Sequence, residues 1–180
     1  MVASRWLWGA AILIALAGIQ AALAGRLEIH GIPPDIVLVG VMAYAMTIGG
    51  PVRGAVVGLA AGLVLDLMGG GPLGLFALAT GMAGWLCGEA GGRFDLDSGW
   101  VRWLVGMLMA GLYGAIVIAG SRFVGRYPVN LTGALEHALL AAPYDGVLAA
   151  LASWPTILFR RRQRALRWGM GSQAAGRFGA

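Results

Sequence analysis

The sequence has no lysine and few charged residues of any kind. Its 13 basic residues are all arginines, and charged residues make up only 12% of the 180-residue chain. A soluble domain is typically about 25% charged. Hydrophobic residues account for 59% of the chain, and the mean hydropathy is +0.78. This composition excludes an ordinary soluble domain and predicts an all-α, polytopic membrane protein.

Cysteine and histidine are almost missing. Cys87 is the single cysteine, so no intrachain disulfide can form, and no Cys/His spacing suited to a metal is present. His30 and His137 are far apart in the sequence, and a closed metal site needs several ligands. We therefore expect no bound metal ion and no cofactor, and we interpret both histidines as interface or loop residues.

Catalytic motifs are missing as well. The five serines are scattered, and none lies in a G-x-S-x-G context. The sequence contains no P-loop, no H-E-x-x-H and no paired-carboxylate motif inside a span. We therefore expect a protein that is not an enzyme.

What the sequence does contain is a series of six apolar segments. A membrane-spanning helix needs about 20 apolar residues, with a range of about 17 to 25. The segments cover residues 6–24, 35–48, 54–68, 73–88, 101–121 and 132–159. We predict a bundle of about six transmembrane helices over residues 1–159, followed by a basic and flexible cytoplasmic tail at residues 160–180.

Four of these segments leave alternatives open. The first has Arg5 before it and the small residues Ala22–Ala24 at its end, as a signal peptide would. It is longer than the usual apolar core of about 7 to 15 residues, so a retained helix is favoured. The second and third are short and suggest a tight helical hairpin, broken at GGPVRG with Arg53 at its tip. The last contains Pro143, which predicts either a kink or an interfacial helix leading into a membrane helix.

The arginines are unevenly distributed between the two sides that six spans define. With both termini in the cytoplasm, ten arginines are cytoplasmic and only Arg26, Arg122 and Arg126 lie outside. This asymmetry follows the positive-inside rule. The densest group consists of Arg160, Arg161, Arg162, Arg164 and Arg167. A nucleic-acid site is the less favoured interpretation, because basic residues beside a membrane helix set topology and contact anionic lipids.

Small residues recur every four positions in three of the predicted helices. The third helix carries Gly54, Gly58 and Gly62, the fourth carries Gly84 and Gly88, and the fifth carries Gly106, Ala110 and Gly114. In lipid, such stripes allow close approach of helix backbones. We interpret them as packing surfaces within the chain; the alternative is that one stripe faces a membrane helix of a partner.

An aspartate and a cluster of glycines end the third segment. Asp66 lies near the C-terminal end of the predicted helix, where the helix dipole disfavours an anion and burial requires a partner. The turn that follows contains Gly69, Gly70, Gly71, Pro72 and Gly74. We predict that this turn brings backbone N–H groups, including those at the start of the next helix, to Asp66. Proton or solute coupling and the support of a partner surface are the alternatives.

Two further aspartates lie beside prolines. Asp35 follows Pro33 and Pro34, which suit the first turn of a helix, where a carboxylate is favourable. Asp145 follows Pro143 and Tyr144, beside the expected kink. It could line a small polar cavity there. The favoured interpretation is that it lies at the start of a helix.

Four stretches together resemble the MreD family of rod-shape-determining membrane proteins. They are PPDIVLV at 33–39, GPVRGAVVGLAAGLVLDLMGGGPLGLFAL at 50–78, PYDGVLA at 143–149 and WPTILFRRR at 154–162. The second is the most characteristic, with a glycine-spaced helix, then Leu-Asp, then a glycine-proline-leucine-glycine turn. Asp145 departs from the resemblance, because many relatives carry asparagine after the tyrosine.

This resemblance implies a non-enzymatic scaffold of the bacterial inner membrane. Members of the family bind the bitopic protein MreC and, through it, MreB, RodA and a penicillin-binding transpeptidase of peptidoglycan synthesis. Their fold is similar to the substrate-binding subunits of energy-coupling-factor vitamin transporters, which makes a small-solute carrier subunit the second interpretation. The aspartates, the glycine-rich turn and the Pro143–Asp145 stretch are then structural or partner-surface residues.

Overall fold

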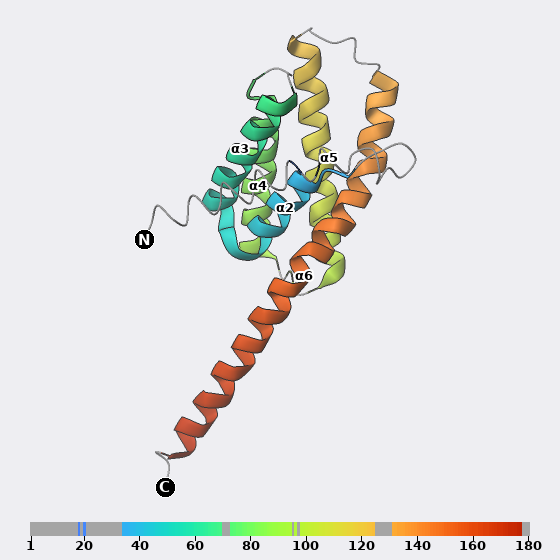
Figure 1. The fold of residues 1–180 in the computed structure, drawn as a ribbon. Coiled ribbons are helices and arrows are strands. Elements are labelled where there is room, and N and C mark those ends of the chain that lie inside the picture. The colour runs from blue at the N-terminus through green and yellow to red at the C-terminus, as the bar shows by residue number, and fades with distance from the viewer. Residues whose placement is uncertain are drawn as a thin grey trace.

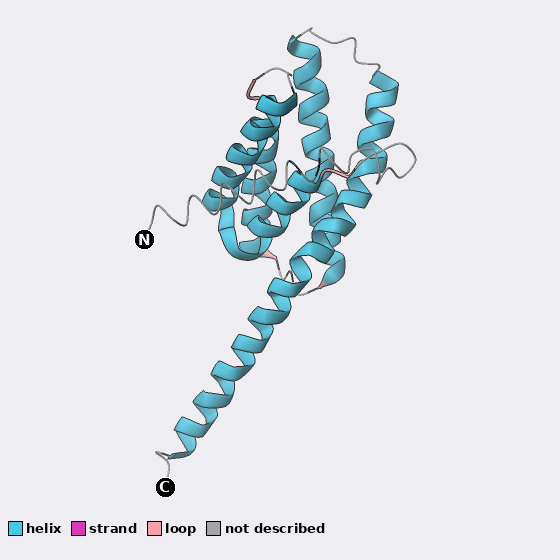
Figure 2. Cartoon of the chain, in the orientation of Figure 1, coloured by secondary structure: helices cyan, strands magenta, loops and turns pink. Residues whose placement is uncertain are grey.

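The computed structural model is entirely helical outside short turns (Figures 1 and 2). It describes residues 34–69, 73–94, 96, 98–124 and 131–177, together with Gly18 and Gln20, and no strand occurs in these residues. The predicted all-α class is confirmed. Other predicted features lie outside the description: most of the first helix, Pro33, Gly70, Gly71, Pro72, and the side chains from residue 156 onward, which include the arginine cluster.

The described helices follow the order of the predicted segments. They are α2 (Ile36–Tyr44), the π-helical η1 (Ala45–Gly49), α3 (Gly50–Gly69), α4 (Leu75–Arg93), α5 (Gly99–Val124) and α6 (Leu131–Arg177). Asp35 caps α2, because its carboxylate accepts a hydrogen bond of 3.0 Å from the N–H of Leu38. Pro34 therefore precedes the helix instead of lying in its first turn.

The reversal between η1 and α3 is tighter than the sequence suggests. The predicted six-residue break is wrong: the turn is made at Gly50, whose φ of +67° favours glycine. Pro51 then lies in the first turn of α3, where a missing N–H costs no helical hydrogen bond. Arg53 lies in the same turn and is exposed.

Two antiparallel helical pairs form the bundle. Helix α3 packs against α4, α5 packs against α6, and α4 joins the pairs by packing against α5. Helix α2 lies between the pairs and contacts α3, α4 and α6 (Figure 1). Its side chains make up much of the core, with Leu38 and Met42 fully buried.

The small-residue stripes face inward, as predicted for packing within the chain. A Cβ atom added at Gly54 or Gly58 would collide with the backbone of Gly84 or Thr80 on α4. The Thr80 hydroxyl crosses this interface and donates a hydrogen bond of 2.6 Å to the carbonyl oxygen of Gly58. The stripe of α5 faces α6 in the same way, since an added Cβ at Gly106 would lie 3.0 Å from the Cα of Gly146. Neither stripe is left free for a partner.

Large apolar side chains instead cover the exterior. On α3 the exposed ones are Val52, Val56, Leu59, Leu63, Leu67 and Met68. Residues Gly50–Gly69 and Gly99–Phe123 are long and apolar enough to cross a membrane, and only 28% and 17% of their apolar windows are buried. The core helix of a soluble protein would be mostly buried, so this surface is better suited to lipid than to water.

Helix α6 is longer than its predicted segment. It runs without interruption from Leu131 to Arg177 and contains both Pro143 and Pro155. In Figure 1 its first turns run at an angle to the remainder, and the C-terminal part projects beyond the bundle. The region predicted to be a flexible tail is therefore helical as far as Arg177.

Candidate functional site

Asp66 joins α3 to the start of α4 through three hydrogen bonds. Its Oδ2 accepts from the backbone N–H groups of Gly74 and Ala77, and its Oδ1 accepts from that of Phe76, each at 3.0 Å. The side chain is 1% exposed. The prediction that Asp66 bonds to the free N–H groups of the following helix is confirmed by these contacts.

The position of Asp66 explains how a carboxylate is tolerated at the end of α3. The dipole of α3 opposes the charge, but the N-terminal end of α4 is positive and lies against the same carboxylate. Gly74, with φ of +96°, makes the turn that presents this end to Asp66. Gly69 is exposed and has open space around it, so it contributes no contact to Asp66.

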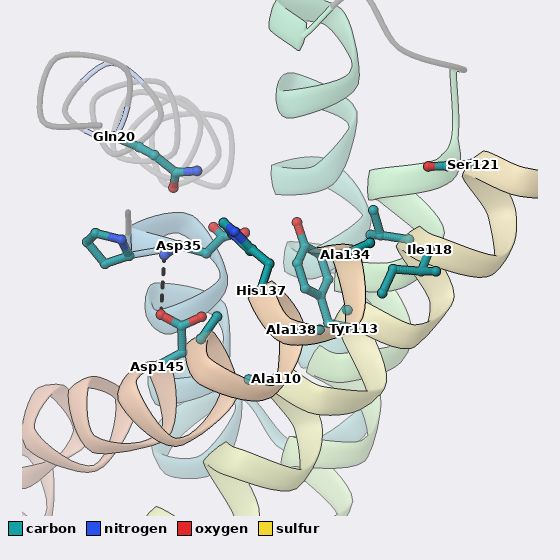
Figure 3. A pocket seen from close by; sticks show the side chains of 14 residues that line it. Gln20, Asp35, Ala110, Tyr113, Ile118, Ser121, Ala134, His137, Ala138 and Asp145 are labelled. Carbon is teal, nitrogen blue, oxygen red and sulfur yellow. Dashed lines mark hydrogen bonds between the residues drawn. The ribbon is translucent and has the colours of Figure 1, made fainter. Parts of the chain in front are cut away.

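A second polar contact joins the start of α2 to the middle of α6. The backbone N–H of Asp35 donates a hydrogen bond of 3.2 Å to Oδ1 of Asp145 (Figure 3). Tyr113 on α5 lines the same pocket as Asp35 and Asp145. The start of α2 and the middle of α6 thus meet at two carboxylates, of which that of Asp145 is buried and that of Asp35 is partly buried.

The interpretation of Asp145 as a helix-start residue is wrong. It lies inside α6, two residues after Pro143, and is 4% exposed. Pro143 lacks an N–H, but its carbonyl oxygen accepts a hydrogen bond of 3.2 Å from Nε1 of Trp103. The alternative that the sequence left open, a place beside a polar cavity, agrees with the structure. Tyr144 is partly exposed next to it.

This cavity is a pocket of about 400 Å³ between α5, α6 and the start of α2 (Figure 3). Its polar lining residues are Gln20, Asp35, Tyr113, Ser121, His137 and Asp145. Its remaining wall is small or aliphatic and includes Ala110, Gly114, Val117 and Ile118. Small-molecule sites typically have about 300–1,000 Å³ and a mostly apolar lining with a few polar groups, so the pocket has the size and character of such a site.

Sequence reasoning missed four of the polar lining residues: Gln20, Tyr113, Ser121 and His137. His137 was interpreted as an interface or loop residue, but it lies within α6 and faces the pocket. Tyr113 carried a usable signal, because a tyrosine in the middle of a predicted span, beside a stripe of small residues, needs a polar partner.

The described residues contain no group of three or more His, Cys, Asp or Glu side chains placed to hold a metal ion. The Glu89 and Arg93 ion pair at the end of α4 is solvent-facing and lies apart from both aspartate sites. The chemistry available in the pocket is therefore that of hydrogen bonding and of negative charge.

No protein-family model, curated protein or solved structure matches the chain. The expected likeness to energy-coupling-factor subunits accordingly stays a prediction.

Proposed function

We propose that this chain is a multi-pass protein of the bacterial cytoplasmic membrane and a non-enzymatic scaffold of the MreD type. In this role it binds MreC and, through MreC, serves MreB, RodA and a penicillin-binding transpeptidase during synthesis of the peptidoglycan that keeps the cell rod-shaped. A fold alone does not determine a function, so the proposal has to be supported by specific residues.

The main support for this proposal is that the stretches that resemble the MreD family contain the residues that join the helices. Asp35, in the stretch 33–39, donates its N–H to Asp145, in the stretch 143–149. Asp66 and its three donors all lie within the stretch 50–78. The residues on which the resemblance depends are thus those that fix the relative positions of α2, α3, α4 and α6, as expected for a protein whose task is to hold a surface in shape.

The directions of the described helices support an orientation with the C-terminus in the cytoplasm. Arg53 at the start of α3, Arg93 at the end of α4 and Arg102 near the start of α5 lie at the end of the bundle toward which α6 leaves (Figure 1). Arg122, near the end of α5, lies at the opposite end. This grouping agrees with the positive-inside rule; the proposed first span, at 6–24, lies almost wholly outside the described residues.

The surface we assign to MreC surrounds the Asp66 turn. Leu67, Met68 and Leu73 are 69%, 55% and 74% exposed there. Leu67 and Met68 lie at the end of α3 and Leu73 lies just before α4, two helix ends that the Asp66 hydrogen bonds join. Such an anchored apolar patch is suited to a membrane-embedded partner.

Affinity capture from native membranes, with mass spectrometry of the captured proteins, tests this function. We expect wild-type protein to capture MreC and the double variant Leu67→Ala with Leu73→Ala to capture less of it. A matched control, Leu139→Ala with Leu151→Ala, truncates two exposed leucines on α6 and should leave capture unchanged. Absence of MreC from the wild-type capture, with the protein folded and monodisperse, would refute the scaffold role.

The pocket favours a second candidate, the small-solute subunit of a membrane transporter. Its polar groups converge on about 400 Å³ of space between α5 and α6. A carrier subunit should retain a solute through purification and capture transporter components in place of MreC, and the same mass-spectrometric experiment separates the two functions.

A further inference from the structure

The polar end of the pocket carries two carboxylates, and His137 is the one basic side chain among its described lining residues. Asp35 and Asp145 both line it, and none of the described lining residues is an arginine or a lysine. Gln20 has its side-chain oxygen occupied by the N–H of Val37, at 2.8 Å. The two carboxylates therefore dominate the charge of this end.

The two carboxylates differ in whether they have an oxygen free to accept a hydrogen bond from a ligand. Asp35 accepts a hydrogen bond from the N–H of Leu38 at the start of α2, so its carboxylate already caps a helix. Within the described part of the chain, Asp145 is bonded through Oδ1 alone. Figure 3 shows its second oxygen on the side of the pocket where Tyr113 and His137 lie. A side chain that is 4% exposed thus directs an unused acceptor into the cavity.

An acceptor of this kind is stabilised most strongly by a donor that carries positive charge. Burying a carboxylate without a compensating partner is costly, whereas a cation within hydrogen-bond distance offsets that cost. An ammonium group supplies both the charge and up to three N–H donors. It would bond to Oδ2 of Asp145 and lie near the Asp35 carboxylate.

The pocket wall away from the two aspartates indicates which chemical groups the rest of the ligand should have. From Asp145 and Tyr113 the pocket extends along Val117 and Ile118 toward Ser121 near the end of α5. This wall offers apolar contact and few hydrogen-bonding groups. A ligand that fills it has an ammonium group at one end and an apolar body.

We propose that this pocket binds the primary ammonium group of a small amphipathic molecule, with Asp145 as its main anionic partner. This inference does not rest on the scaffold function, because the residues around the Asp66 turn take no part in it. The ammonium group belongs either to the headgroup of phosphatidylethanolamine or to a free amine, and the experiment below distinguishes these two sources.

Isothermal titration in a neutral detergent tests the proposal with phenethylamine and 2-phenylethanol, which differ in carrying an ammonium group or a hydroxyl group. We expect wild-type protein to bind the amine at least tenfold more tightly than the alcohol. Asp145→Asn retains an Oδ1 acceptor for the Asp35 N–H, so it should fold, but it should lose this preference. Glu136→Gln removes a carboxylate from an exposed position of the same helix and should leave the preference intact.

A second variant tests the apolar wall without changing a carboxylate. Ile118→Trp should weaken the binding of both probes at least tenfold. Native mass spectrometry of protein purified from membranes then identifies the source. A phosphatidylethanolamine adduct that is present in wild type and lost in Asp145→Asn indicates the lipid; amine binding without an adduct indicates a free amine.

Equal affinity for amine and alcohol would overturn the proposal. So would wild-type preference for the amine in a folded Asp145→Asn protein, or the absence of both amine binding and a lipid adduct. Capture of MreC by the same Asp145→Asn protein shows separately whether the scaffold function holds.

Discussion

The backbone N–H of Asp35 and the carboxylate of Asp145 form a hydrogen bond of 3.2 Å between residues that are 110 positions apart in the chain. The bond ties the start of α2 to the middle of α6, close to the helix bend that Pro143 favours. It is the longest-range side-chain contact among the hydrogen bonds described for this chain, and it fixes how the central helix α2 sits against the α5–α6 pair.

Replacing Asp145 tests the energetic weight of this contact. Asp145→Leu leaves the partly buried N–H of Asp35 without its acceptor, which costs about 1–3 kcal/mol. Asp145→Asn keeps an acceptor oxygen, so we expect a loss below about 1 kcal/mol. Unfolding in mixed micelles of dodecyl maltoside and increasing SDS, followed by circular dichroism, measures both losses. Equal stability of the two variants would contradict the role given to this bond.

Asp66 should be the more sensitive aspartate, because its carboxylate satisfies three N–H groups and that of Asp145 satisfies one. At about 1–3 kcal/mol for each unsatisfied donor, Asp66→Leu should destabilise the protein more than Asp145→Leu in the same unfolding measurement. Asp66→Asn, which keeps one acceptor oxygen, should lie between Asp66→Leu and wild type. A normally folded Asp66→Asn protein that captures MreC but fails to support rod shape would point instead to a proton- or solute-coupled role.

Alanine substitutions at two glycines of α3 test how closely α3 packs against α4. A Cβ at Gly58 would meet the backbone of Thr80 and Gly81, whereas a Cβ at Gly69 would meet nothing within 4 Å. Gly58→Ala should therefore cost about 1–3 kcal/mol from overpacking. Gly69→Ala should be neutral or stabilising by up to about 1 kcal/mol, since alanine is the better helix former. Similar effects of the two substitutions on unfolding would show that this helix contact is looser than described.

Alkaline phosphatase fusions test the membrane topology. The enzyme is active only after export, so a fusion after Arg126 should be active and a fusion after Arg167 should be inactive. The expectation rests on ten arginines on one side against three on the other. The reverse pattern of activity would place the arginine cluster outside and would exclude the proposed orientation.

The sequence by itself determined the features that depend on composition and on nearby residues. Hydropathy and helix-breaking residues located every described helix, and the spacing of Gly54, Gly58 and Gly62 identified a packing face. The Asp66 contact could also be predicted from the sequence. Its farthest donor is only 11 residues away, and the first N–H groups of a helix have no partner within that helix.

Only the tertiary structure decided which distant groups meet. The approach of Asp35 to Asp145 and the pocket beside them depend on how α2, α5 and α6 cross. Local pattern does not encode such crossings, because many pairings of apolar helices bury similar surface. The six-residue break predicted before α3 failed for a related reason: the close contact of Gly88 with Gly50 on the neighbouring helix lets one glycine make the whole reversal.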